Sequence, residues 1–125
     1  MPMPSYKYTI PKNSEIFPDH NIIMKRAANS SNWEVFIKNK NNNEVVWTTS
    51  TTWRPTANNG HSPFVAMRDD RNSENNPGAM ELLAFATYRN NLDKISGAYV
   101  NWEKGGVISI KHFIADKVVA PKDAD

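Results

Sequence analysis

The sequence predicts an all-β, mostly antiparallel domain with a β-prism or sandwich-like arrangement. The first of two hairpin patterns spans residues 33–53, where Val35–Ile37 and Val45–Trp47 flank an asparagine-rich tip. β-Branched and aromatic residues on both sides of a polar turn are typical of paired strands. The second hairpin pattern spans residues 98–113, with a Gly105-Gly106 turn at its centre. Eight prolines, five glycines and many asparagines also favour turns over long helices.

The length and composition indicate a single domain over residues 1–125, large enough for one hydrophobic core. The chain has no cysteine, which excludes disulfides and thiol chemistry. It shows no basic segment followed by an apolar run, and no apolar stretch near the ~20 residues of a membrane span. We therefore expect a soluble protein without a signal peptide or membrane span, either cytoplasmic or released by a non-classical route.

Other strands are predicted from short apolar runs. Tyr6–Ile10 alternates like an edge strand that ends at Pro11, and Ile22–Met24 is a short buried strand. Phe64–Met67 is a further strand, and Val118-Val119 is a candidate for the last one.

Residues 77–95 fit two structures. Asn76-Pro77 resembles a helix start, Gly97 a helix stop, and apolar residues recur between them at spacings of three and four: Leu82, Phe85, Tyr88, Leu92 and Ile95. The alternative makes Leu83–Tyr88 a strand that is followed by an asparagine-rich turn. A helix near 77–95 would change the fold class to α+β.

Two segments, residues 22–47 and 64–102, share one order of features. Each has an apolar pair, a methionine, a polar tip, an apolar strand, an asparagine-rich turn and a closing tryptophan. Self-similarity at ~40 residues is typical of a repeated supersecondary unit. Two unrelated hairpins would produce the same order, so both interpretations remain open.

The segment Met67–Asn72 resembles the bulb-type mannose-binding lectins, whose β-prism repeats carry Gln-x-Asp-x-Asn-x-Val-x-Tyr. The opening IPKNSEIFPDHNII and the segment VVWTTST also resemble parts of that family. Asp70 and Asn72 match the family's Asp and Asn, whereas Arg68 replaces its Gln and residues 73–81 are an insertion. The resemblance implies a non-catalytic, sugar-binding β-prism.

The other copies of that motif depart further from the family. Lys25 replaces the Gln, Ala27 replaces the Asp, and Asn32 keeps the Asn in the first repeat. The third repeat keeps nothing that aligns. The family's mannose site is therefore altered in every copy.

A sugar site needs side chains that donate to and accept from neighbouring hydroxyls, and an aromatic face against the C–H side of the ring. Amide and carboxylate side chains meet the first need and tryptophans the second. The candidate ligand-binding residues are Asp70, Asn72, Asn32, Trp53 and Trp102. The alternative is a solvated Asp-Asp-Arg-Asn turn over a tryptophan-rich core.

Catalysis and metal binding are not expected. His20, His61 and His112 have no paired metal-ligand spacing, and no phosphate loop or nucleophile elbow is present. We predict no enzyme activity, metal or cofactor, and a carbohydrate or glycoconjugate as partner, with a homodimer left open.

The net charge of +2 disfavours nucleic acid, although Lys38, Lys40 and Arg54 interleave with tryptophans. The alternative function is a small α+β domain that contacts protein or nucleic acid, such as an inhibitor or toxin component.

Overall fold

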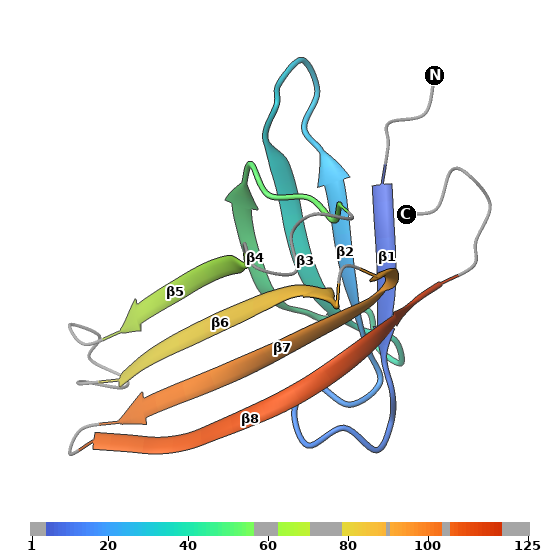
Figure 1. Ribbon diagram of the computed structural model, residues 1–125. Coiled ribbons are helices and arrows are strands. Elements are labelled where there is room, and N and C mark those ends of the chain that lie inside the picture. The colour runs from blue at the N-terminus through green and yellow to red at the C-terminus, as the bar shows by residue number, and fades with distance from the viewer. Residues whose placement is uncertain (1–4, 57–62, 71–78, 90, 104–105, 119–125) are drawn as a thin grey trace.

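The fold is all-β, which confirms the predicted fold class. The computed structural model describes residues 5–56, 63–70, 79–89, 91–103 and 106–118, which contain eight strands and no helix (Figure 1). The strands are β1 (Ser5–Ile10), β2 (His20–Arg26), β3 (Trp33–Asn39), β4 (Val45–Thr51), β5 (Phe64–Asp70), β6 (Ala79–Tyr88), β7 (Asn91–Glu103) and β8 (Gly106–Lys117).

All eight strands belong to one antiparallel sheet in the order β4-β3-β2-β1-β8-β7-β6-β5. Strands β4 and β5 follow each other in the chain but end the sheet on opposite sides, so the sheet curls into a nearly closed barrel. In Figure 1, β1–β4 run steeply across the direction of β5–β8. The two halves meet at a short seam, where Tyr8 pairs with Lys117 and Thr9 with Asp116.

The barrel encloses one hydrophobic core, because alternate residues of every strand point inward. Phe64 and Phe85 stack with their ring centroids 4.5 Å apart, and Phe113 meets Phe85 edge to face. The largest fully buried side chains are Trp47, Tyr8, Phe85, Ile10, Ile22, Met24, Ile37, Leu83, Ile95 and Val35. Each such side chain stabilises the fold by roughly 1.5–3 kcal/mol relative to exposure.

The alternative helix near residues 77–95 is wrong. Residues 79–88 form β6 and residues 91–95 begin β7, and Arg89 after β6 has a φ of 51°. The expected helix start at Asn76-Pro77 lies outside the described residues. Leu83 and Phe85 point into the core, but Leu82 and Ala84 on the opposite face are also apolar. Apolar residues on both faces hide the two-residue period of a strand, so chance spacings of three and four resembled a helix.

The expectation that Tyr6–Ile10 forms an edge strand is also wrong. β1 lies between β2 and β8, and the edge strands are β4 and β5. Of the candidate last strand, Val118 lies just beyond the end of β8, and its backbone N–H donates to the carbonyl of Lys7 at 2.9 Å. Val119 lies outside the described residues. Contacts between the two ends of a chain leave no local signal, so the sequence could not reveal this pairing.

The two similar segments each form three consecutive antiparallel strands, β2–β4 and β5–β7. Their closing tryptophans are not equivalent. Trp47 is 2% exposed inside the barrel, whereas Trp102 is half-buried on the outer face of β7, opposite Met80.

Arg68 bridges the gap between β4 and β5. Its Nη1 donates to the carbonyl of Val46 at 2.9 Å, and its guanidinium lies 4.0 Å from the ring centroid of Trp47. Its Nε and Nη2 donate to the two carboxylate oxygens of Glu81 at 2.9 and 2.8 Å. The hydroxyl of Tyr99 also donates to Glu81. This cluster links two strands that share no backbone pairing.

Two tyrosines in the barrel have raised pKa values. Tyr8 is fully buried and its hydroxyl donates to the carbonyl of Leu92 at 2.5 Å; burial raises the pKa of its phenol above the usual 10.0. Burial, and then the hydrogen bond to Glu81, raises the pKa of Tyr99 in the same direction.

The free energy of unfolding is therefore expected to fall as the pH rises above about 10, where tyrosines of the unfolded chain ionise. Below that pH both states are protonated; above it only the unfolded chain loses the protons. Each tyrosine that ionises only in the unfolded chain lowers the free energy of unfolding by about 1.4 kcal/mol per pH unit. Urea titrations between pH 8 and 11.5 measure the slope, which Tyr8→Phe should reduce. A stability that rises over this range would contradict the assignment.

Candidate ligand-binding site

The mouth of the barrel beside the β2–β3 turn holds a cavity of about 330 Å³. We call it the mouth cavity; its lining residues are Tyr6, Arg26, Ser31, Trp33 and Arg54. The strand period places three of them there, since Tyr6, Arg26 and Trp33 lie two residues beyond the core residues Tyr8, Met24 and Val35 on the same face. The mouth cavity therefore sits directly above the core.

Two aromatic rings line the mouth cavity. The centroids of Tyr6 and Trp33 are 5.4 Å apart, with their planes inclined by 43°. Trp33 is 5% exposed and belongs to the core, while Tyr6 is half-buried and packs against that core. A ring held in this way loses little freedom when a ligand packs on it.

Two exposed arginines give the mouth cavity a positive charge. Nε of Arg26 donates to the carbonyl of Ser30 at 3.0 Å, which positions its guanidinium beside the turn. Among the described residues, nothing accepts a hydrogen bond from the Nη groups of Arg26, and none of the lining side chains is acidic. Guanidinium groups bind carboxylate, sulfate and phosphate oxygens in a bidentate manner.

Local hydrogen bonds shape the turn beside the mouth cavity. The N–H of Ala27 donates to the carbonyl of Asn32 at 2.9 Å, and the N–H of Asn32 donates to Oγ of Ser30 at 3.0 Å. Asn29 adopts a φ of 56°, a conformation that asparagine tolerates better than most residues. The turn is thus specified by its own sequence.

The predicted sugar-binding residues lie in separate places. Asn32 is exposed and lies between Ser31 and Trp33, two residues of the mouth cavity. Trp53 is half-buried and packs edge to face on Phe85, at 5.4 Å between centroids.

Of the other three predicted residues, Asp70 and Trp102 belong to the far end of β5–β8. Asp70 pairs with Ala79 in the sheet, close to the pair Met80 and Trp102. The side chain of Asp70 and all of Asn72 lie outside the part of the chain that the structure describes. Among the described residues, Asn32 and Trp53 each adjoin a lining residue of the mouth cavity in the sequence, and neither lines the cavity itself.

Sequence reasoning missed Tyr6 and Arg26, and grouped Arg54 with the tryptophans only in the nucleic-acid alternative. The available signal was alternation: Tyr6, Tyr8 and Ile10 share one face, as do Met24 and Arg26. A residue two positions beyond the last core residue of a strand lies at the mouth of a barrel.

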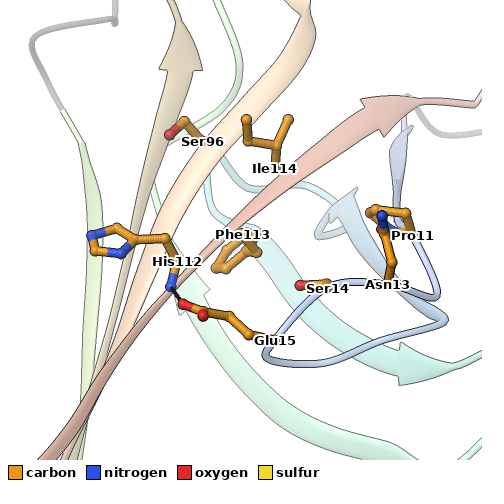
Figure 2. Close-up of a pocket in the computed structure, with 8 residues that line it drawn as sticks. All are labelled: Pro11, Asn13, Ser14, Glu15, Ser96, His112, Phe113 and Ile114. Atoms are coloured by element: carbon orange, nitrogen blue, oxygen red, sulfur yellow. Dashed lines mark hydrogen bonds between the residues drawn. The ribbon is translucent and has the colours of Figure 1, made fainter.

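A larger cavity of about 470 Å³ lies between the β1–β2 loop and strands β7 and β8 (Figure 2). Its polar side chains form hydrogen bonds within the β1–β2 loop and between this loop and β8. Oε1 of Glu15 accepts the backbone N–H of His112 at 2.8 Å, and Oγ of Ser14 donates to Ile16 at 2.7 Å. Phe17 from the same loop packs edge to face on Phe113. This cavity has no concentration of charge comparable with that of the mouth cavity.

Within the described ranges, no three histidine, aspartate or glutamate side chains gather into a group suited to a metal ion. No described segment forms a helix with the length and apolarity needed to cross a membrane.

Comparisons with family models, with curated proteins and with solved structures find no match to this chain. The likeness to the bulb-type lectins therefore rests on the short motifs alone. Within the described residues, the mouth cavity carries the chemistry best suited to a ligand.

Proposed function

We propose that this protein is a non-catalytic carbohydrate-binding domain that holds an acidic glycan in the mouth cavity. The observation that supports this is the combination of two exposed arginines with the Tyr6–Trp33 pair in one open cavity. Barrel mouths are common ligand sites, and about 330 Å³ lies at the lower end of the usual range for such sites. That space suits one or two sugar units.

Each part of an acidic sugar has a matching group. Arg26 and Arg54 suit a carboxylate or sulfate, and the hydroxyl of Ser31 suits a ring hydroxyl. The half-buried ring of Tyr6 offers apolar contact to the C–H face of the sugar. The proposal keeps the carbohydrate ligand that the sequence predicts but moves it from Asp70 and Asn72 to the mouth cavity.

A glycan array tests the ligand class. We expect retention on glycans that carry a uronic acid, a sialic acid or a sulfate, and none on neutral mannose glycans. Single-stranded DNA serves as a second probe, because arginines beside aromatic rings also suit nucleic acid. Retention on neutral mannose alone would contradict the proposal. Binding to DNA with a steep loss of affinity between low and high salt would favour the nucleic-acid alternative.

Arg26→Gln should weaken binding of an acidic glycan at least tenfold, because a charge-assisted hydrogen bond contributes about 1.5–3 kcal/mol. Lys25→Gln is the matched control: it removes the same charge from the next residue, which points out of the barrel. Isothermal titration calorimetry measures both. Equal losses in the two variants would mean that overall charge, and not the mouth cavity, attracts the ligand.

The same titration separates the mouth cavity from the site that the lectin motif implies. Asp70→Ala and Asn72→Ala should leave the affinity unchanged, since Asp70 ends β5 at the far end of the β5–β8 half. A tenfold loss in either variant, with full affinity in Arg26→Gln, would place the sugar at the lectin motif.

A further inference from the structure

The outer surface of the β5–β8 half carries an ordered row of apolar side chains. The register pairs Met67 with Leu82, Leu82 with Val100, and Val100 with Ile110, so these residues form one line across all four strands. Val65 and Ile114 lie on the same outer surface. We call these six residues the apolar face.

Most of the exposed large hydrophobic side chains among the described residues belong to the apolar face. Val65 is 55% exposed, Met67 57%, Ile110 57% and Ile114 45%. Within the described residues, the other exposed large hydrophobic side chains are Val45 on β4 and Leu92 near the start of β7, beyond Lys94. Single exposed apolar residues are ordinary, but a contiguous patch of several hundred Å² marks an interaction site.

The charge around the apolar face indicates which kind of surface can bind it. The described side chains that share the outer surface with these rows are alanines, Ser96, Trp102, Met80 and His112, none of them acidic or a permanent cation. At its rim, Lys94 and Asp116 form an ion pair at 2.6 Å, and the carboxylate of Glu15 lies beside His112 and Ile114. A surface that binds anionic lipid carries a cationic rim, whereas the described rim has no net positive charge.

The shape and size fit a second copy of the same chain. Two sheet faces pack about 10 Å apart with interdigitated side chains, and uncharged faces meet without like-charge repulsion. Four strands at ~4.8 Å and about eight residues at ~3.3 Å give a face of roughly 500 Å² per copy. Two copies would then cover roughly 1,000 Å², the lower limit for a specific interface.

We propose that two copies of this chain associate through the apolar face, as a symmetric dimer with a dissociation constant on the order of micromolar. Each copy then keeps its mouth cavity free, because the β2–β3 turn belongs to the other half of the barrel. A dimer would present two ligand sites at once, which raises the avidity for a surface that carries many copies of one glycan.

Analytical ultracentrifugation of the full chain between 1 and 500 µM tests this dimer. The wild type should shift from monomer to dimer within that range, whereas Met67→Asp and Ile110→Lys should each stay monomeric at 500 µM. Both residues are more than half exposed, so circular dichroism melts should remain close to wild type. Val45→Asp is the control, since Val45 is 46% exposed on β4 and should leave the dimer intact.

Several results would overturn the dimer. These are a wild type that remains monomeric at 500 µM, or face variants that associate as strongly as Val45→Asp. Flotation with phosphatidylcholine vesicles is the second assay: a monomer that floats with vesicles, and loses this in Met67→Asp, would assign the apolar face to a lipid surface instead. The dimer test does not depend on the glycan, since it uses no sugar.

Discussion

Arg68→Ala is expected to lower the free energy of unfolding by about 3 kcal/mol, because it leaves the carboxylate of Glu81 without its bidentate partner. The side chain of Glu81 is only 18% exposed, so water does not fully replace the lost donors. The substitution also removes the hydrogen bond from β5 to Val46 and the contact with Trp47, which together bridge the unpaired gap between β4 and β5.

Urea unfolding followed by tryptophan fluorescence measures this loss. Arg89→Ala is the matched control, since that exposed guanidinium lies 5.2 Å from the ring centroid of Tyr88 and should change the stability by less than about 0.5 kcal/mol. Combining Arg68→Ala with Glu81→Gln should cost much less than the sum of the single changes, because both remove the same ion pair. Additive losses, or a loss below about 1 kcal/mol for Arg68→Ala, would show that the contacts of Arg68 do not stabilise the junction between β4 and β5.

Gly97→Ala is expected to lower the free energy of unfolding by about 3 kcal/mol, at the upper end of the usual cost of overpacking a core. A Cβ at this position would lie 2.3 Å from Cζ of Phe113 and 2.8 Å from the carbonyl oxygen of Ala84. The Phe113 ring is 3% exposed and is held between Phe17 and Phe85, so it has little room to move away.

Ser96→Ala, at the neighbouring position on the outer surface, should leave the stability within about 0.5 kcal/mol of wild type. Phe113→Leu in the Gly97→Ala background should recover part of the loss, because the smaller side chain relieves the contact with Cζ. If Gly97→Ala unfolded at the wild-type urea concentration, the close packing of Phe113 on Gly97 would be refuted.

The local parts of the fold were predictable. The hairpins at residues 33–53 and 98–113 carry their own turn signals, and the structure forms both as β3–β4 and β7–β8. The pairing of β1 with β8 joins Tyr8 to Lys117, and no local pattern encodes a contact of that range. Residues 79–88 were ambiguous because Leu82 lies on the apolar face while Leu83 fills the core.

The candidate site was predictable only in part. The sequence indicates Asn32 and the neighbouring turn, but the mouth cavity also requires Arg54, which lies beyond β4, next to Tyr6 of β1. Strand alternation predicts which face Arg26 occupies. It does not predict that the barrel closes so that these side chains surround one space, because closure depends on pairing between distant strands.

The most direct test of the mouth cavity is a ¹H–¹⁵N NMR titration of the wild-type protein with the strongest acidic glycan from the array. If the glycan binds in the mouth cavity, we expect saturable shifts of the Trp33 indole N–H, the Arg26 guanidinium and the backbone amides of residues 27–32, all beside this cavity. The neutral analogue without the acidic group should produce none at the same concentration. Shifts confined to Asp70 and its neighbours, with the Trp33 and Arg26 signals unmoved, would contradict binding in this cavity.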